Sequence, residues 1–352
     1  MTSLSLRYGV GFPELVTLMT EWGEPEYRAQ QVWTALYRPE PLDSITTLPM
    51  ALKDRLVEAL PLSLDELNVV SDSTGLTTKW LWAAGDDRSE IETVLMRSAR
   101  RATVCISSQA GCAMACTFCA TGQAGFKRHL SVAEIIEQVT RAAHASPQRV
   151  SNVVYMGMGE PLANYRPVWE SVARIHADLK ISARRITVST VGVVPAMLQL
   201  AREELPITLA VSLHAPNDDL RATLVPLNNR YPIADILAAA AEVAGAHGRR
   251  VTFEYACIAG VNDKSEHARE LSSLLGRWPG VGGAHVNLIP LNPTAEFGGQ
   301  RSPRRHLEQF AELLRSGGVS ATIRRPRGVD IDAACGQLRS RIALPAPESV
   351  KL

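Results

Sequence analysis

The sequence predicts an α/β protein whose largest part is a partial (β/α)6 barrel, preceded by a small N-terminal helical domain and a short antiparallel β extension. Three observations support this prediction. Residues 1–65 carry apolar side chains at helical spacing. The stretch from Leu67 to Ser107 consists of short segments rich in β-branched and aromatic residues. From Ser131 onward, strand and helix patterns alternate, which is typical of parallel βαβ units.

The N-terminal helical domain is expected at residues 1–65 and contains three predicted helices, at 12–23, 26–36 and 48–60. In the first of them, Phe12, Leu15 and Met19 are spaced to share one helical face. Residues 66–104 form the predicted β extension. Its strands are TTKWLWAA (77–84), EIETVLMR (90–97) and ATVCISS (102–108), separated by the turn-forming stretches AGDDRS and SARR.

The barrel core is expected at residues 105–325, followed by a C-terminal tail at 326–352. Its first helix, 131–145, begins with Ser131 and has Glu134 three positions later, which indicates a capping box. Further strands are predicted at 149–157, 184–190, 206–214, 249–258, 284–291 and 320–325, with helices at 165–179, 194–204, around Leu220 and Ile236, 265–277 and 303–316. About six units can be counted, fewer than the eight of a complete barrel, so an open or partial barrel fits best.

Composition excludes several classes of protein. The chain has 352 residues with 46% hydrophobic and 21% charged residues, which is ordinary for a globular protein and excludes disorder over most of its length. Its 37 basic and 36 acidic residues give a net charge of +1, which excludes a uniformly basic nucleic-acid binder but not a local basic face. No apolar run reaches the roughly 18–20 residues of a membrane-spanning helix, and the N-terminus lacks a signal-peptide pattern. We therefore expect a cytoplasmic protein without membrane contact.

A cluster of cysteines is the most specific feature of the sequence. Cys112, Cys116 and Cys119 form a C-x3-C-x2-C motif between a predicted strand and a predicted helix. Three thiolates on one loop can hold three irons of a [4Fe–4S] cluster and leave the fourth iron open to a substrate. A zinc site with His129 as fourth ligand is one alternative, although zinc sites usually combine two separated pairs of ligands. Unligated thiols are the other alternative.

The remaining three cysteines have no local motif. On residue type alone, Cys335 would be a buried free cysteine, which is a common small hydrophobe. Cys105 stands at a strand end and could be either a cluster ligand or a core residue. Cys257, in a predicted strand, is expected to be core.

The cysteine motif, with Phe118 before its last cysteine, resembles the cluster motif of radical S-adenosylmethionine (SAM) enzymes. GMGEP at 157–161 resembles their GGEP segment, which contacts the amino group of SAM. Further segments narrow the resemblance to the RNA adenine methyltransferases of the RlmN/Cfr type: CISSQAGCAMACTFCATGQAGFKRHL, MGMGEPLANY, VSTVGVVP, VSLHAPND, NLIPLNP and RGVDIDAACGQL. The resemblance implies a radical-SAM barrel, a [4Fe–4S] cluster held by Cys112, Cys116 and Cys119, and two SAM molecules per turnover.

The resemblance also implies a two-stage reaction. One SAM methylates a protein cysteine, which Cys335 matches, and a second SAM supplies the radical that activates this methyl group for addition to the adenine ring. Cys105 matches the thiol that resolves the protein–RNA thioether through a transient disulfide with Cys335. Glu92 matches the general base that removes the ring proton, and a carboxylate on a half-buried strand can have the raised pKa that suits a base. Without the resemblance, Glu92 would be a solvent-facing residue beside Glu90.

The SAM contacts implied by the resemblance follow predicted strands, where a barrel places its chemistry. They are Gly159, Glu160, Ser189, Ser212, Leu213, His214 and Asn292.

The expected reaction is formation of 2-methyladenosine in 23S ribosomal RNA, at the peptidyl-transferase centre, and at position 37 of tRNA. The alternatives are Cfr-type methylation of carbon 8 of the same ribosomal adenine and a non-catalytic RNA-binding protein with a structural metal site. We expect a monomer that takes electrons from a reductant such as flavodoxin or ferredoxin, with the N-terminal domain as a candidate RNA-binding region. Basic runs at Arg97–Arg101, Lys127–His129 and Arg324–Arg327 are candidate phosphate contacts.

Overall fold

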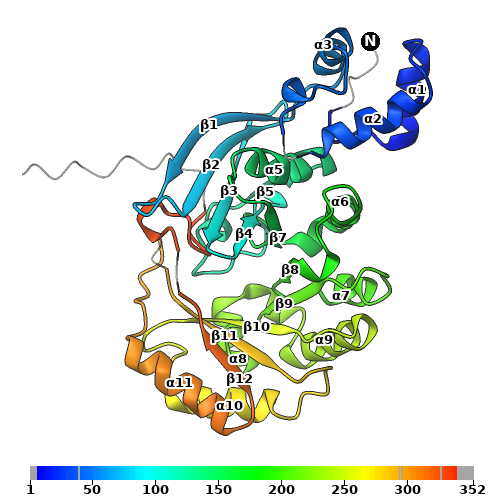
Figure 1. Ribbon diagram of the computed structural model, residues 1–352. Helices are drawn as coiled ribbons and strands as arrows, with labels where there is room; N and C mark the ends of the chain where they lie inside the picture. Colours follow the sequence, from blue (N-terminus) through cyan, green and yellow to red (C-terminus); the bar gives the residue numbers. More distant parts are fainter. Residues whose placement is uncertain (1–5, 39, 293, 295, 326, 339–352) are drawn as a thin grey trace, which may run out of the picture.

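The computed structural model describes residues 6–38, 40–292, 294, 296–325 and 327–338. Its main element is a ten-stranded sheet in the order β1-β2-β3-β4-β7-β8-β9-β10-β11-β12. Strands β1 to β4 are antiparallel to their neighbours, and from β4 onward the pairs are parallel. The sheet is open, because β1 and β12 lie at its two ends (Figure 1). The predicted partial barrel with an antiparallel extension is therefore confirmed.

Three helices and a 3₁₀ turn precede the sheet: α1 (Phe12–Glu21), α2 (Tyr27–Leu36), the turn Leu42–Ser44 and α3 (Met50–Ala59). Their apolar faces form a small core of their own, which includes Leu15, Val32 and Leu56. Ile136, from the first barrel helix, belongs to the same cluster. The N-terminal helices therefore rest on the barrel through shared hydrophobic contacts (Figure 1).

The antiparallel extension contains β1 (Leu64–Ser71), β2 (Thr77–Ala84), β3 (Ser89–Ser98) and β4 (Arg101–Cys105). The sequence pattern predicted the last three but not β1, whose residues are mostly exposed and half of them polar. Pairing with β2 makes this segment a strand, and its other edge has no strand partner among the described residues because β1 ends the sheet.

The parallel strands after β4 are β7 (Val150–Tyr155), β8 (Ile186–Thr190), β9 (Thr208–Ser212), β10 (Thr252–Cys257), β11 (His285–Pro290) and β12 (Ser320–Ile323). The helices that connect them are α5 (Val132–His144), α6 (Tyr165–Ala177), α7 (Val194–Leu200), α8 (Asp218–Leu224), α9 (Ile233–His247), α10 (Ser265–Leu275) and α11 (Arg304–Ser316). Each of β4, β7, β8, β9, β10 and β11 is thus followed by helix and then by the next parallel strand, as six β/α units require.

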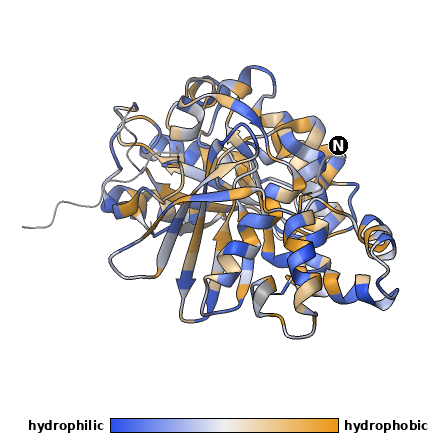
Figure 2. Ribbon diagram, turned by 90° about the horizontal axis from the view of Figure 1, so that it is seen from above, coloured by the Kyte–Doolittle hydropathy of each residue, from blue (hydrophilic) through white to orange (hydrophobic). Residues whose placement is uncertain are grey.

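Smaller elements complete the chain. The hairpin of β5 (Gln109–Gly111) and β6 (Phe126–His129), with α4 (Ala120–Gln123) between its strands, was not predicted. Short 3₁₀ turns lie at Pro161–Asn164, Ala183–Arg185, Pro226–Asn229 and Val329–Ile331. Seen from above, the strands lie inside a row of helices and carry both hydrophobic and hydrophilic residues (Figure 2).

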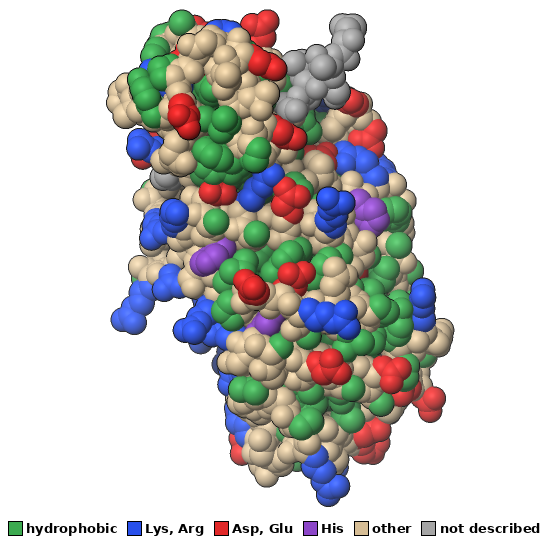
Figure 3. All heavy atoms as spheres, turned by 90° about the vertical axis from the view of Figure 1, so that its right-hand side faces the viewer, with side chains coloured by type: hydrophobic (Ala, Val, Ile, Leu, Met, Phe, Trp, Pro, Cys, Tyr) green, Lys and Arg blue, Asp and Glu red, His purple; other side chains and the backbone are tan. Residues whose placement is uncertain are grey.

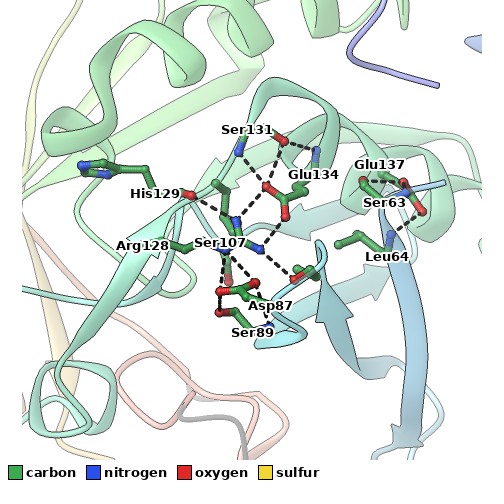
Figure 4. Close-up of polar contacts among 12 residues, drawn as sticks. Ser63, Leu64, Asp87, Ser89, Ser107, Arg128, His129, Ser131, Glu134 and Glu137 are labelled. Carbon is green, nitrogen blue, oxygen red and sulfur yellow. Dashed lines mark hydrogen bonds and ion pairs between the residues drawn. The ribbon is translucent and has the colours of Figure 1, made fainter. Parts of the chain in front are cut away.

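Polar contacts fasten α5 to the extension (Figure 4). Ser131 and Glu134 form the predicted capping box, with the Ser131 backbone N–H donating to Glu134 at 2.7 Å. One turn later, Glu137 accepts hydrogen bonds from the backbone N–H and the hydroxyl of Ser63, both at 2.7 Å. Arg128 forms ion pairs with both Asp87 and Glu134. These contacts hold the start of β1 and the end of β2 against the first barrel helix.

The register of the sheet places the chemistry-bearing side chains on one face. Val94 of β3 pairs with Cys105 of β4, and Ser212 of β9 pairs with Glu254 of β10. Residues paired across strands project to the same side, and side chains two positions apart along a strand do likewise. The register, followed from strand to strand, shows which side chains share the face opposite to the helices that pack on the sheet. They include Glu92, Cys105, Ser212 and Glu254. Within the described part of the chain, no helix is long and apolar enough to cross a lipid bilayer.

Candidate active site

A cavity of about 160 Å³ lies at the carboxyl ends of the parallel strands. Ligand sites of α/β folds form at this edge, because the loops that follow the strands meet there. The lining includes Cys116, Phe118, Cys119, Gly159, Glu160, Ser189, Ser212, His214, Glu254, Asn292, Arg324 and Cys335. Predicted cluster, SAM-contact and methyl-carrier residues from six separate sequence segments are therefore brought together in one cavity.

The loop that carries Cys112, Cys116 and Cys119 is held at several points. Gly111 has φ +75°, and a Cβ there would lie 2.0 Å from the carbonyl oxygen of Gly125, so the hairpin requires glycine. The Cys112 N–H donates to that same carbonyl at 2.8 Å. Thr117 donates to the carbonyl of Leu224, at the end of α8, at 3.0 Å. The three thiols thus lie on a loop tied to two different parts of the barrel.

Burial and neighbouring charges raise the pKa of two of the three thiols. Burial raises the pKa of Cys112 to about 12, with smaller contributions from the charges of Glu160 and Cys119. Burial also raises the pKa of Cys116 well above its ordinary value, and Cys119 and Cys112 add to the shift. Thiols in such a site bind as thiolates only when a cation compensates the charge. The donor set therefore fits a thiophilic metal centre such as an iron–sulfur cluster.

In the described residues, no three His, Cys, Asp or Glu side chains lie together as a set that could hold a metal ion, so the three thiols of the loop share a segment without converging on one point. His129, the fourth ligand of the zinc alternative, is an exposed residue of β6. Its Nδ1 lies 3.1 Å from Gln109 Nε2, and its ring packs edge-on against Phe126. The zinc alternative therefore lacks its fourth ligand, whereas three thiols on one loop are the donors that a cluster with an open iron needs.

Glu160 is a buried carboxylate at the edge of the same cavity. It accepts hydrogen bonds from the backbone N–H groups of Leu162, at 3.0 Å, and Val191, at 2.9 Å. Burial nevertheless raises its pKa to about 7, against the lowering effect of these bonds. Gly159 has φ +98°, and a Cβ there would lie 2.5 Å from the Cβ of Gln109. The carboxylate is thus held in one orientation at the edge of the cavity.

His214 is buried and neutral. Burial lowers its pKa to about 3, with a smaller contribution from Arg221. Its Nδ1 accepts a hydrogen bond from the Ala256 N–H at 3.0 Å, and its ring packs edge-on against Phe118 with centroids 4.8 Å apart. The remaining ring nitrogen, Nε2, therefore carries the proton.

The other predicted SAM contacts lie nearby, with one exception. Ser189 and Ser212, at the ends of β8 and β9, line the cavity, as does Asn292 after β11. Leu213 is fully buried and does not line it. The Leu213 carbonyl instead accepts a hydrogen bond from Arg221 Nε at 3.0 Å.

Arg221 was not predicted from the sequence, yet it organises this edge of the barrel. It is fully buried, and its guanidinium donates to the carbonyls of Leu213, Ser212 and Val191 and to Asn228 Oδ1. One side chain thereby holds the ends of two strands together. Nothing in the sequence marks Arg221 as buried, because an arginine on a short helix is usually solvated.

The C-terminal tail closes over the cavity and carries Cys335 into it. The Asn292 amide donates to the Cys335 carbonyl at 3.0 Å, and the Ala120 N–H of α4 donates to the Gly336 carbonyl at 2.8 Å. Gly336 has φ +84°. The tail is therefore fastened to the cysteine loop on one side and to the end of β11 on the other. Of the predicted tail, 326–352, the residues 326 and 339–352 lie outside the described part.

A second cavity, of about 530 Å³, adjoins the first. Cys105 and Cys335 both line it, together with Arg324 and Glu254. Burial raises the pKa of Cys105 to about 12, with Cys335 adding to the shift and Arg324 opposing it. Cys335 in turn raises the pKa of Arg324, more than any other neighbour. The two thiols and the guanidinium thus lie close together, and all six cysteines of the chain are free.

Glu92 lies deep in β3 and does not line either cavity. Its side chain is 1% exposed, and its Oε1 lies 2.9 Å from Lys79 Nζ. The solvent-facing interpretation of this residue is therefore wrong. Glu92 shares its sheet face with Cys105, because Cys105 pairs with Val94 and Val94 lies two positions after Glu92 on β3. Lys79 was not singled out by the sequence, since nothing local marks a buried lysine.

Some residues of the predicted basic runs are exposed, and others are held by contacts within the protein. Arg325 and Arg327 are exposed and line the second cavity. Arg324 is half-buried and turned inward, and Arg128 forms ion pairs with Asp87 and Glu134. Over the outer face in Figure 3, Lys and Arg alternate with Asp and Glu. Arg101, Arg250, Arg325 and Arg327 line the second cavity, so part of its lining is basic.

Comparison with known families agrees with this geometry. A family model described as the radical SAM superfamily matches residues 106–271. A solved structure of a radical SAM methyltransferase from Sphaerobacter thermophilus superposes with a TM-score of 0.90 at 45% identity, covering 96% of this chain and 99% of that one.

Two relatives extend the similarity over nearly the whole chain. A protein of Parafrankia sp. is 50% identical over 342 residues, covering 91% of this chain and 87% of the relative. A protein of Roseiflexus castenholzii is 43% identical and covers 96% of each chain. Both carry the name "probable dual-specificity RNA methyltransferase RlmN".

Proposed function

The chain belongs to the RlmN family of dual-specificity RNA methyltransferases within the radical SAM superfamily, and we propose that it forms 2-methyladenosine in 23S ribosomal RNA and at position 37 of tRNA. It is a SAM-dependent methyltransferase that acts on RNA, with a [4Fe–4S] cluster and SAM as cofactors. The cluster, when bound, supplies the electron that cleaves SAM. The non-catalytic RNA-binding alternative is therefore not retained.

Cys112, Cys116 and Cys119 would hold the cluster. Support comes from their position on one tied loop and from burial, which makes thiolates unfavourable there without a metal. Glu160 would bind the amino group of SAM, because it is a fixed carboxylate at the edge of the cavity. Gly159, Ser189, Ser212 and Asn292 would shape the rest of that site, with Leu213 and His214 contributing through the loop after β9.

Cys335 would carry the methyl group between SAM and RNA, and Cys105 would release the RNA through a transient disulfide. The single observation that carries this assignment is that Cys335 lines both cavities while Cys105 lines the second. A methyl carrier must reach the SAM site and the RNA site, and the resolving thiol needs to reach only the carrier. Glu92 would act as the base that accepts the ring proton, from the sheet face it shares with Cys105.

RNA would enter at the second cavity. Its mouth carries Arg101, Arg250, Arg325 and Arg327, which can hold phosphates while one adenine is extruded into the interior. The helices of residues 1–65 would extend the RNA contact. We further propose a monomer in the cytoplasm, where ribosomes and tRNA are modified, reduced by a flavodoxin or ferredoxin.

An anaerobic reaction tests this function directly. Purified enzyme is incubated with SAM, a low-potential reductant and transcribed 23S ribosomal RNA or tRNA, and the digested nucleosides are identified by mass spectrometry. Formation of 2-methyladenosine in both RNAs is expected. Formation of 8-methyladenosine would instead assign the Cfr-type reaction, and methylation of neither RNA would refute the substrate assignment.

A further inference from the structure

Lys79 is a buried cation with partners in two segments that the proposed function assigns to different tasks. Its Nζ lies 2.9 Å from Glu92 Oε1 on the adjacent strand. The same Nζ donates a hydrogen bond of 3.2 Å to the carbonyl of Asp332 in the tail. Asp332 is three residues before Cys335. One ammonium group therefore lies between the proposed base and the segment that carries the proposed methyl carrier.

The sheet register accounts for the contact with Glu92. Lys79 pairs with Val94 and Glu92 pairs with Leu81, so Lys79 and Glu92 are diagonal neighbours on one face. Their side chains are 5% and 1% exposed. Such a dry ion pair adds little net stability, because the loss of hydration offsets most of the attraction. Positioning explains the pair better than stability does.

The contact with Asp332 depends on how the tail is docked. Asp332 has φ +51°, and the Ala333 N–H next to it donates to the Gly328 carbonyl at 2.8 Å. A Cβ on Gly328 would lie 2.9 Å from Thr77 Cγ2, so the tail rests directly on β2. The Ser73 N–H donates to Asp330 at 3.1 Å from the turn that precedes β2. These contacts aim the Asp332 carbonyl at Lys79, and the tail passes beside the extension in Figure 1.

We propose that Lys79 is a positioning residue that couples the orientation of Glu92 to the docking of the tail. The proposal rests on the proposed function for the roles of Glu92 and Cys335. With the tail docked, the ammonium group is held by the Asp332 carbonyl and fixes the Glu92 carboxylate. When the tail leaves, the ammonium group loses that acceptor and its hold on the carboxylate. The base is therefore in place when the carrier thiol is in place.

Amide hydrogen exchange of the anaerobic holoenzyme, followed by mass spectrometry, tests the coupling without RNA or turnover. The observed peptides are the tail, 329–338, and strand β10, Thr252–Cys257, as an internal reference. The variants are Lys79→Met, Lys79→Arg, Glu92→Gln and the double variant Lys79→Met with Glu92→Gln. Arg88→Met is the matched control, because it removes an exposed ion pair with Asp65 in the same extension.

Loss of the ammonium group should free the tail. In Lys79→Met, exchange of the tail amides should rise about tenfold, the effect of losing a hydrogen bond from a charged donor, while exchange in β10 is unchanged. Lys79→Arg, which keeps the charge and the donors, should restore most of the protection. Glu92→Gln alone should also accelerate exchange in the tail, because the buried ammonium group loses its counter-ion. In the Lys79→Met background, Glu92→Gln should add nothing.

Three results would overturn the coupling. The first is unchanged amide exchange of the tail in Lys79→Met. The second is an equal rise of amide exchange in β10, which would indicate general loosening of the fold. The third is an effect of Glu92→Gln on tail exchange that is the same with and without Lys79. Because none of these measurements involves RNA or methyl transfer, they fail independently of the proposed function. Nucleoside products from the same wild-type preparation report the proposed function separately.

Discussion

Cys105 at the end of β4 and Cys335 in the C-terminal tail line the same cavity, although nearly the whole barrel separates them in sequence. The Cys335 charge raises the pKa of Cys105, which shows that the two thiols are close enough to interact. Arg324 lines the same cavity, and its charge opposes the rise in the pKa of Cys105. The fold therefore supplies two thiols and a cation in one cavity, an arrangement compatible with thiol–disulfide exchange.

Separate replacement of these two thiols should stop the reaction at different stages. Cys335→Ala should transfer no methyl group, because the carrier is absent. Cys105→Ala should still accept a methyl group on Cys335 and then remain covalently attached to RNA, as a slowly migrating band on a denaturing gel. Cys257→Ala is the control, since Cys257 is buried in β10 away from both cavities. Normal turnover of Cys105→Ala without an adduct would exclude the resolving role.

Each cysteine of the loop should be indispensable for the cluster. In Cys112→Ala, Cys116→Ala and Cys119→Ala, one of the three protein ligands is missing, so bound iron and the release of 5′-deoxyadenosine from SAM should fall together. Iron analysis and chromatography of the nucleoside products measure both quantities. A single variant with full iron content and full SAM cleavage would show that its cysteine is not a ligand.

Glu160 should make the metal-free protein less stable as the pH rises. Its pKa is about 7 when folded and about 4.5 when unfolded, so the folded state binds the proton more tightly. Its contribution is fully present below about pH 4.5 and is lost as the pH rises to about 7, by about 3 kcal/mol. Glu160→Gln stays neutral and lacks this loss. Urea unfolding at pH 5 and pH 8 compares the two proteins, and an identical pH dependence would contradict the assignment.

Arg325 and Arg327 should contact RNA phosphates. Changing both to Gln should weaken RNA binding and lower the slope of log affinity against log salt by roughly 0.7–0.9 for each lost contact. Arg304→Gln on α11 is the control, because Arg304 is equally exposed but outside both cavities. In the proposed reaction the methylation of Cys335 by the first SAM precedes RNA binding, so it should persist in the double variant. Unchanged affinity and slope would identify these arginines as solvated surface residues.

Local patterns were sufficient for the parts of the site that are local in sequence. The C-x3-C-x2-C spacing, the glycine before Glu160 and the capping box at Ser131 each lie within a few residues, and the strand–helix alternation predicts where their loops meet. The structure adds that these loops share one cavity.

Burial of charged side chains could not be predicted in this way. Lys79 and Arg324 are buried or half-buried because residues far away in sequence surround them, as Asp332 contacts Lys79, and Arg221 is buried because the turn back from its short helix brings strand-end carbonyls to it. A lysine or arginine without such information is expected at the surface. Strand β1 was missed for a similar reason, since half of its residues are polar, most are exposed, and its pairing with the distant part of the sheet through β2 makes it a strand.

The methylated nucleosides of cells that lack the gene test the central claim most directly. Mass spectrometry of digested 23S ribosomal RNA and tRNA should show that 2-methyladenosine disappears in the deletion strain. The wild-type gene should restore it, and the gene encoding Cys335→Ala should not. Retention of 2-methyladenosine in both RNAs of the deletion strain, or loss of 8-methyladenosine in its place, would contradict the account.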